Sequence, residues 1–450
     1  MPDSMKKPNV YNVIGIGLGP FNLGFAALAE GVTEIDAMFF EKKPQFDWHP
    51  GMMIEGTTLQ VPFLADLVSM ADVTSKYSFL NYLQNQNRLY RFYFREDFHI
   101  PRKEFNHYCQ WVTEQLTNCQ FHKNVKQVDL RDIDGQSLYE VVVEDVQTRK
   151  QSVYLAEHIV MGIGTVPAIP AQLQSALGEN IFHTADYLYK KGKCKEVESI
   201  AVIGSGQSAA EVFLDLLEEQ HSYGYSLKWY TRSKGFFPME YSKLGLEHFS
   251  PDYTSFFYHL PQEKKDKLLR EQDLLYKGIS SDTISDIYEL LYQRSIGSEE
   301  PDIHLQAMSA IESIEPIGNR WRLHGVQQVS EENFTDDTDL IVLGTGYKPK
   351  IPDFLSPLYG RIAWDRQGRF EVLEDYRLKM NGSKNNSIYI QNGEIHTHGV
   401  GAPDLGLGAH RNAVIINALA GREIYPVKPI NIFQSFDGQK QPVRSSVHQS

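Results

Sequence analysis

The chain has 450 residues, of which 42% are hydrophobic and 22% charged, as in a globular protein of one very large or two to three ordinary domains. Its net charge of −13 argues against nucleic acid or an anionic membrane as a partner, and no apolar run reaches the roughly 20 residues that span a bilayer. The N-terminus lacks the apolar segment of a secretory signal, and the three cysteines form no CxxC pair, so we expect a cytoplasmic protein.

A strand, a glycine turn and a helix open the chain and predict a dinucleotide-binding unit. A β-branched run at 10–14 precedes three alternating glycines and an apolar helical pattern, with asparagine where a third fingerprint glycine is usual. Such glycines let the backbone approach a pyrophosphate, and the helix N-terminus offers free N–H groups. The next strand, 35–41, ends in an acid, where the ribose hydroxyls of an adenosine would lie. The predicted contacts are Gly15, Gly17, Gly19, Pro20, Asn22 and Glu41.

A second unit of the same kind lies at 199–217, and two units in one chain are far more specific than one. The strand that follows, 227–231, ends in basic residues, which accommodate a ribose 2′-phosphate where an acid would select a free hydroxyl. The first unit is therefore predicted to hold FAD and the second NADPH. Arg232 alone could equally be a solvated loop charge, but the contrast between the two strand ends favours the phosphate. The predicted contacts are Gly204, Gly206, Gln207, Ser208 and Arg232.

Strands that run into glycine turns at 160–165 and 340–347 look like crossings between two nucleotide domains. These patterns predict an α/β fold with two Rossmann-like, three-layer domains. An aromatic stretch with helical periodicity is predicted to cover the active site, although it could instead be a bulky packing element. The predicted division is an FAD-binding domain at 1–190 and 335–450, with a polar C-terminal tail, and an NADPH-binding domain at 191–334, with the helical insertion at 236–297.

In this order, the features resemble the L-lysine/L-ornithine N-monooxygenase family, flavoenzymes that hydroxylate amines for siderophore biosynthesis. The block from Trp48 to Leu83 is the most specific part, because unrelated two-Rossmann reductases lack it. The matching stretches are 15–23, 48–52, 59–60, 66–67, 78–83, 102–105, 344–347, 397–399 and 411–413. The resemblance adds these predicted cofactor contacts: Trp48, His49, Gln60, Thr345, Asp404 and Leu407.

The resemblance implies that NADPH reduces FAD and that the reduced flavin forms a C4a-hydroperoxide with O2, which hydroxylates the substrate amine. Because the chemistry is centred on the flavin, we expect neither a catalytic triad nor a metal. Only the neutral amine is nucleophilic, and an alkyl ammonium has a pKa of about 10.4, so apolar walls must disfavour the charged form. The family resemblance also suggests a homodimer or homotetramer. Candidate wall residues are Phe236, Phe237, Tyr241 and Phe249.

Four positions depart from the family's substrate contacts. Members that act on amino acids carry a lysine, which pairs with the substrate carboxylate, where this chain has Ala65. Losing that lysine would leave a buried carboxylate unpaired, at a cost of about 2–5 kcal/mol. Two family asparagines are replaced by Leu246 and, in a looser alignment, Ile279, and a family serine is replaced by Gly406. The departures predict a substrate without a carboxylate.

Putrescine and cadaverine fit that description, and resemblance to desferrioxamine-type enzymes slightly favours cadaverine. The far ammonium of the diamine needs an acidic or carbonyl partner. N-hydroxylation of L-lysine, L-ornithine or another amine such as histamine remains an alternative. Three other functions also remain alternatives: a monooxygenase that oxidises a sulfur or a ketone, an NADPH oxidoreductase that makes no hydroxylated product, and a non-catalytic flavoprotein with a binding role. Candidate acids for the far ammonium are Glu240, Glu247 and Asp404, each of which could instead be a surface or capping acid.

Overall fold

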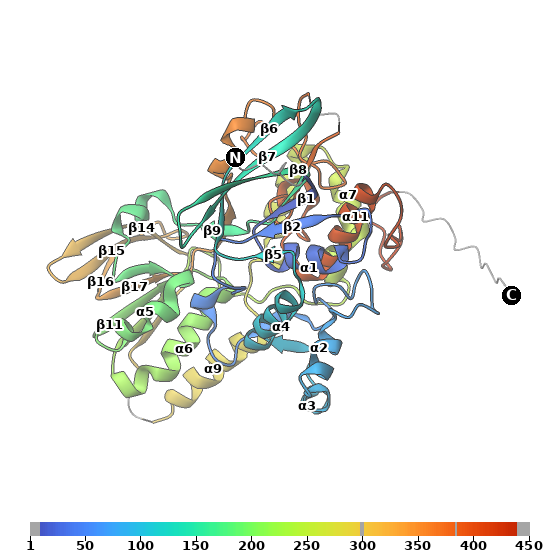
Figure 1. Ribbon diagram of the computed structural model, residues 1–450. Coiled ribbons are helices and arrows are strands. Elements are labelled where there is room, and N and C mark those ends of the chain that lie inside the picture. Colours follow the sequence, from blue (N-terminus) through green and yellow to red (C-terminus); the bar gives the residue numbers. More distant parts are fainter. Residues whose placement is uncertain (1–9, 298–300, 383–384, 439–450) are drawn as a thin grey trace.

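Two sheets with parallel strands organise the computed structural model, which describes residues 10–297, 301–382 and 385–438 (Figure 1). The first sheet has the order β5-β2-β1-β8-β7-β6, and β19 pairs with β8. The pairs β1–β2, β1–β8 and β19–β8 are parallel, whereas β6, β7 and β8 form an antiparallel meander. Its strands are β1 (Val10–Ile16), β2 (Ala37–Phe40), β5 (Cys119–Gln120), β6 (Lys123–Ile133), β7 (Gln136–Asp145), β8 (Gln151–Met161) and β19 (Ser387–Ile390).

The second sheet has the order β10-β17-β11-β12-β13, with every pair parallel, and it lies at the lower left of Figure 1. Two of its strands, β10 and β17, lie outside the range 191–334, so this sheet draws on chain from both sides of the predicted domain boundaries. The α/β class with parallel sheets is confirmed, and the exact domain division stays a prediction. The strands are β10 (Ile181–His183), β11 (Ser199–Ile203), β12 (Ser226–Tyr230), β13 (Ile303–Gln306) and β17 (Leu340–Leu343).

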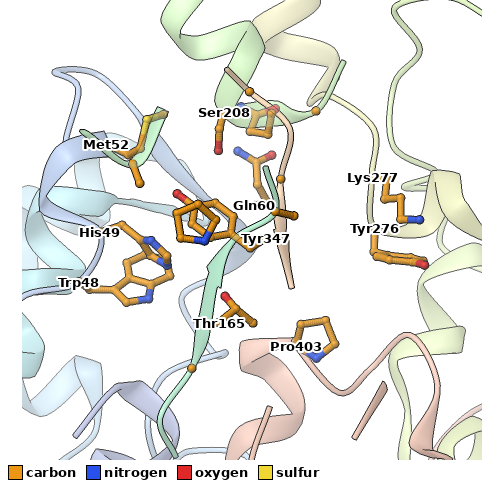
Figure 2. A pocket seen from close by; sticks show the side chains of 18 of the residues that line it. Trp48, His49, Met52, Gln60, Thr165, Ser208, Tyr276, Lys277, Tyr347 and Pro403 are labelled. Carbon is orange, nitrogen blue, oxygen red and sulfur yellow. The ribbon is translucent and has the colours of Figure 1, made fainter. Parts of the chain in front are cut away.

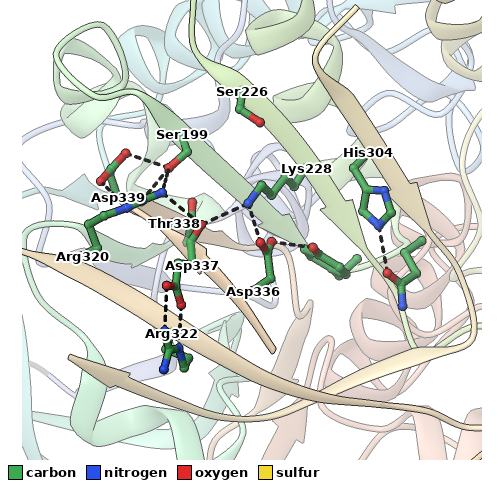
Figure 3. A network of polar contacts seen from close by, with 12 residues as sticks. Ser199, Ser226, Lys228, His304, Arg320, Arg322, Asp336, Asp337, Thr338 and Asp339 are labelled. Carbon is green, nitrogen blue, oxygen red and sulfur yellow. Dashed lines mark hydrogen bonds and ion pairs between the residues drawn. The ribbon is translucent and has the colours of Figure 1, made fainter. Parts of the chain in front are cut away.

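An antiparallel three-stranded sheet packs beside the second sheet through a polar network (Figure 3). Lys228 Nζ on β12 donates to Asp336 Oδ1 at 2.6 Å, and the Tyr230 hydroxyl donates to Asp336 Oδ2 at 2.6 Å. Arg320 pairs with Asp339 at 3.1 Å on the same side. These contacts hold the small sheet in one position against β12. It comprises β14 (Ser309–Ile317), β15 (Arg320–Gln327) and β16 (Asn333–Thr338).

Helices cover the sheets in the way that a dinucleotide-binding fold requires. Helix α1 follows the first glycine turn, is buried along its whole length, and packs against α4 and α11. Helix α6 follows the second glycine turn and packs against α9. Within the described ranges, none of the helices has the length and apolar character that a bilayer crossing requires. The helices are α1 (Pro20–Ala29), α2 (Phe79–Asn85), α3 (Leu89–Arg95), α4 (Arg102–Gln115), α5 (Tyr187–Cys194), α6 (Gln207–Tyr223), α7 (Pro251–Tyr258), α8 (Gln262–Glu271), α9 (Ser281–Arg294), α10 (Ile395–His398) and α11 (Gly408–Ala420).

The chain passes between the two large sheets twice, and the two crossings lie side by side. Strand β9 (Thr165–Pro167) follows β8 of the first sheet, and β18 (Tyr347–Pro349) follows β17 of the second. They pair antiparallel, with Tyr347 opposite Pro167. A further antiparallel pair, β3 (Thr58–Pro62) with β4 (His99–Pro101), lies close to the start of α4. The paired crossings bring the ends of both parallel sheets to one region.

Asn22 connects three segments of the first sheet and is 0% exposed. Its Nδ2 donates to the carbonyls of Gly17 at 2.7 Å, Ile16 at 3.2 Å and Val160 at 3.2 Å, while its Oδ1 accepts from Gln391 Nε2 at 2.8 Å. The side chain is therefore used entirely inside the protein. Our prediction that Asn22 contacts a cofactor directly is wrong, because the amide holds the glycine turn in place from behind.

The substitution Asn22→Ala is expected to destabilise the protein by about 2 kcal/mol or more, because it leaves buried carbonyls and the Gln391 amide unpaired. Thermal unfolding followed by circular dichroism measures the effect. The control is Asn85→Ala, at an exposed position where the amide bonds only the Asn81 carbonyl. Equal unfolding midpoints for the two variants would contradict this role.

Candidate active site

A single connected cavity of about 3320 Å³ lies between the two glycine turns. It is several times larger than the roughly 300–1,000 Å³ of a pocket for one small ligand. Figure 2 shows Trp48 and His49 on one side of this space and Tyr276 and Lys277 on the other. A cavity of this volume, with a glycine turn at each edge, has room for more than one large ligand.

The first glycine turn leaves space for a ligand above α1. Gly17 has a φ of 81°, and a Cβ there would lie 2.6 Å from the Gly162 carbonyl, whereas a Cβ on Gly19 would meet open space. Pro20 begins α1, where its missing N–H is no loss. Gly15 has a different role, because a Cβ there would lie 2.1 Å from the Phe39 ring. It permits packing of β1 against β2 and does not line the cavity.

Glu41 lies at the predicted place, directly after β2, and lines the cavity. Its Oε2 accepts a hydrogen bond from the Leu18 N–H at 2.8 Å, and its Oε1 accepts from the Lys43 N–H at 2.9 Å. The carboxylate is thus fixed beside the glycine turn. This arrangement suits an acid that meets ribose hydroxyls.

The second glycine turn has the same backbone features as the first. Gly204 has a φ of 143°, and a Cβ there would lie 2.1 Å from the Gly344 carbonyl, so only glycine fits. Gly206 precedes α6, and Ser208 in the first turn of α6 lines the cavity. Gln207 also lines it, but its amide is engaged, since Oε1 accepts from the Ser280 N–H at 2.7 Å and Nε2 donates to Glu211 at 2.9 Å. Gln207 therefore acts mainly by holding the start of α9.

Arg232 lies two residues after β12, is exposed, and lines the cavity beside the second turn. Among the residues that the structure describes, no acid forms an ion pair with it. Lys234 lines the same edge and is likewise unpaired within the described ranges. The structure thus sets an acid beside the first turn and free cations beside the second. This contrast fits a ligand with free ribose hydroxyls at one turn and a ribose phosphate at the other.

Between the turns, aromatic and polar side chains form the middle of the cavity. The rings of Trp48 and His49 have centroids 5.1 Å apart, and His49 also contacts Tyr347 edge-on at 5.6 Å. His49 is exposed to the cavity, where desolvation and the nearby charges of Arg102 and Lys43 lower the pKa of its imidazole to about 4. The Thr345 hydroxyl is buried and makes no hydrogen bond with the described residues. A buried hydroxyl without a partner in a cavity wall fits contact with a bound ligand.

Known proteins with similar sequences identify the family of this chain. The sequence model of a family described as L-lysine 6-monooxygenase/L-ornithine 5-monooxygenase matches residues 9–349. A putrescine N-hydroxylase from Shewanella oneidensis is 42% identical over 98% of this chain and 88% of its own length. This chain belongs to that monooxygenase family.

Solved structures of related enzymes agree with this assignment. FAD-bound DfoA from Erwinia amylovora, the cadaverine monooxygenase of the desferrioxamine pathway, has a TM-score of 0.92 at 40% identity, covering 96% of this chain and 100% of that one. An ornithine N-hydroxylase from Kutzneria sp. 744, with reduced FAD, NADP+ and L-ornithine, has a TM-score of 0.84 at 27% identity, covering 91% of this chain and 99% of that one. The monooxygenase fold therefore extends over nearly the whole chain.

Three of the residues predicted to contact substrate meet at one end of this monooxygenase's cavity. Ala65, Asp404 and Gly406 all line it. A Cβ on Gly406 would lie 3.8 Å from Ala65 Cβ and 2.8 Å from Asp404 Oδ1, so the three are direct neighbours. Asp404 Oδ1 accepts from the Gly406 N–H at 2.7 Å, and burial raises the pKa of Asp404 to about 6. Asp404 is thus a partly exposed acid in the cavity wall, near two residues with almost no side chain.

Tyr241 and Gln60 lie at this same end of the cavity. The Tyr241 hydroxyl donates to the Gln60 carbonyl at 3.3 Å and to Gln60 Oε1 at 3.4 Å. Burial, together with the nearby charge of Asp404, raises the pKa of Tyr241 to about 12, so the phenol stays protonated. Leu246 and Phe249 from the insertion add apolar surface to the wall. The end of the cavity therefore combines one acid with apolar and hydroxyl groups.

Three predicted substrate contacts are wrong, because their side chains do not line the cavity. Glu240 is exposed, and its Oε1 accepts from the Ser242 N–H at 2.7 Å. Glu247 accepts hydrogen bonds from the C-terminal segment. Ile279 is 0% exposed inside the core of the second sheet. The predicted cofactor contact Leu407 is also buried, and it packs against Gly401.

Sequence reasoning missed several residues that line the cavity. Leu275 and Tyr276 line the wall a few residues before Ile279, where the looser alignment had put a substrate contact, so the aromatic residue two positions before Gly278 was a usable signal. Arg102 also lines the cavity and forms two hydrogen bonds with Glu211, at 2.7 Å and 2.6 Å. This buried ion pair joins α4 to α6 across the two sheets. In the sequence, Arg102 is only part of a stretch that matches the family, and nothing there indicates that it pairs with Glu211.

The position of Arg232 in the cavity predicts its effect on the preference for NADPH over NADH. The substitution Arg232→Ala is expected to raise the KM for NADPH about tenfold, because a charge-assisted contact to the 2′-phosphate is lost. The KM for NADH should not change. Initial rates of coenzyme oxidation measure both, and Arg366→Ala, an exposed arginine outside the cavity, is the control. An unaltered KM for NADPH in Arg232→Ala would remove this residue from the coenzyme site.

Proposed function

We propose that this protein is an FAD- and NADPH-dependent monooxygenase that hydroxylates one primary amine of an aliphatic diamine, putrescine or cadaverine. The product is an N-hydroxylamine for a hydroxamate siderophore. The observation that supports this most strongly is the acid Asp404 in the cavity wall, near Ala65 and Gly406. Relatives named as putrescine N-hydroxylase and cadaverine monooxygenase, at 42% and 40% identity, support the same substrate class.

Asp404 is the proposed partner of the far ammonium of the diamine. It is ionised above about pH 6, and among the described residues no lysine or arginine forms an ion pair with it. An ammonium group at this place would gain a charge-assisted hydrogen bond with a desolvated carboxylate. The carboxylate of ornithine or lysine would instead face a like charge without a cation, a difference of about 2–5 kcal/mol. The acid thus selects for a diamine and against the parent amino acid.

The reacting end of the diamine needs the opposite environment. Only its neutral amine is nucleophilic, and apolar surroundings lower the pKa of an ammonium group by desolvation. Leu246, Phe249 and Met239 supply apolar surface in the same wall as Tyr241. We infer that the substrate lies with one end charged at Asp404 and the other end neutral toward the middle of the cavity.

The two glycine turns are the proposed sites of FAD and NADPH. Gly17, Gly19 and Glu41 would hold FAD, and Gly204, Ser208 and Arg232 would hold NADPH. Bound together, the coenzymes supply the O2 activation by which amine, O2, NADPH and a proton yield hydroxylamine, NADP+ and water. Trp48, His49 and Thr345 would surround the space between them and limit access of water. An assembly of two or four copies remains a prediction.

A substrate comparison tests this proposal. With the FAD-loaded enzyme, NADPH and O2, hydroxylamine formation from putrescine or cadaverine is expected to exceed that from L-ornithine or L-lysine at least about 30-fold in kcat/KM. Histamine is included as a non-aliphatic diamine. Preference for ornithine or lysine would contradict the role of Asp404, and NADPH oxidation without any hydroxylated product would favour a plain oxidoreductase.

The charge of Asp404 predicts a specific pH dependence. Because burial raises its pKa to about 6, the carboxylate is lost as pH falls through that value, and the KM for the diamine should rise about tenfold per pH unit below it. Both substrate amines stay protonated in solution over this range. In Asp404→Asn the KM should be high and independent of pH, whereas Glu263→Gln, an exposed acid on α8, should behave as wild type. A pH-independent KM in the wild type would contradict the assignment.

A further inference from the structure

The C-terminal segment 424–438, called the strap below, starts on the helices of the first sheet (Figure 1, red). The N–H groups of Ile424 and Tyr425 donate to Asn417 Oδ1 on α11 at 2.7 Å and 3.0 Å. The Tyr425 hydroxyl donates to the Leu28 carbonyl on α1 at 2.6 Å. The beginning of the strap is thus fixed to α11 and α1.

The other end of the strap is fixed to the insertion, mainly through Glu247. Its Oε1 accepts from the Phe433 N–H at 3.0 Å, and its Oε2 accepts from the N–H of Gln434 at 2.9 Å and from Gln434 Nε2 at 3.0 Å. The Gln434 amide also donates to the Leu244 carbonyl at 2.6 Å. One carboxylate therefore receives three hydrogen bonds from two residues that lie 186 and 187 positions away in the sequence.

Two further contacts hold the strap on α7. Asn431 donates from its backbone N–H and its Nδ2 to Asp252, at 3.1 Å and 2.8 Å. The Phe436 ring lies between aromatic neighbours, with centroids 4.8 Å from Tyr253 and 4.9 Å from His248. Phe433, in contrast, is 92% exposed. The position of the strap on the insertion thus depends on a few specific contacts.

The segment held by the strap is a wall of the substrate end. The short 3₁₀ turn Gly245–Phe249 places Leu246 and Phe249 in the cavity, while Glu247 between them points to the strap. Turns of this kind have poor internal hydrogen-bond geometry, and Leu246 is 41% exposed, so the turn has little support of its own. The helix that anchors the strap, α11, begins directly after Leu405–Leu407, next to Asp404. The strap is attached to this helix at Asn417, near its C-terminal end, and it therefore connects α11 with the apolar wall of the site.

We propose that the contact of Glu247 with the strap residue Gln434 positions the Leu246–Phe249 wall and so determines which diamine length the site accepts. This inference rests on the proposed diamine hydroxylation. Glu247 is a positioning residue, because it touches the strap and not the cavity. A wall that moves outward would lose contact with the methylene groups of the substrate and would admit water to the reacting amine. The coenzyme sites at the two glycine turns would be unaffected.

The substitution Glu247→Ala tests the proposal in the full-length, FAD-loaded enzyme. The KM for putrescine and cadaverine is expected to rise about five- to tenfold, with a changed ratio of kcat/KM between the two. FAD content and the KM for NADPH should remain at wild-type values. Gln434→Ala, on the strap side, should give the same changes, and Glu247→Gln a smaller one, because its amide oxygen still accepts one bond. The control is Glu240→Ala, an exposed acid in the same insertion that does not line the cavity.

Hydrogen–deuterium exchange of the peptide that covers 244–250 provides a readout independent of turnover. Exchange there should increase in Glu247→Ala and Gln434→Ala but not in Glu240→Ala. Unchanged diamine KM and unchanged exchange in Glu247→Ala would overturn the proposal, as would an equal loss of FAD and NADPH binding, which indicates general unfolding. A wild-type enzyme that hydroxylates no diamine would instead refute the proposed function, while the exchange data would still decide whether the strap holds the wall.

Discussion

A partly exposed carboxylate in the wall of a large cavity is the feature on which the whole account depends. Asp404 is held by the Gly406 N–H, and its neighbours Ala65 and Gly406 offer no charge to balance it. Removing a carboxylate from water is unfavourable, and here desolvation outweighs the hydrogen bond from Gly406 and raises the pKa of Asp404 to about 6. A ligand that brings its own ammonium removes this penalty. In the proposed function, the site therefore favours a substrate that supplies this positive charge.

The remainder of the structure brings that acid into the same cavity as the two glycine turns, which are the proposed coenzyme sites. Two parallel sheets contribute one glycine turn each, and the paired crossings β9 and β18 bring both turns to one cavity. The ion pair between Arg102 and Glu211 joins the helices that carry the two halves. The insertion and the strap then close the substrate end with apolar surface. Each part excludes water from a region where an uncharged amine must react.

Local patterns predicted the two nucleotide turns, since a strand, alternating glycines and a helix define the backbone there. Glu41 and Arg232 lie where strand ends predicted them. Asn22, Glu247 and Ile279 were misassigned for a different reason. Which way a side chain points depends on contacts far away in the sequence, such as the strap for Glu247 and the Val160 and Gln391 groups for Asn22. Spacing alone contains no such information.

The most direct measurement of the central claim is a crystal structure of the enzyme with FAD, NADP+ and putrescine or cadaverine. Our account predicts that one terminal nitrogen lies about 3 Å from a carboxylate oxygen of Asp404, with the other nitrogen directed toward the flavin ring. Ala65 and Gly406 should leave room for this end of the ligand. A lysine or arginine side chain in the space beside Ala65, or a diamine whose far ammonium is bound away from Asp404, would contradict it.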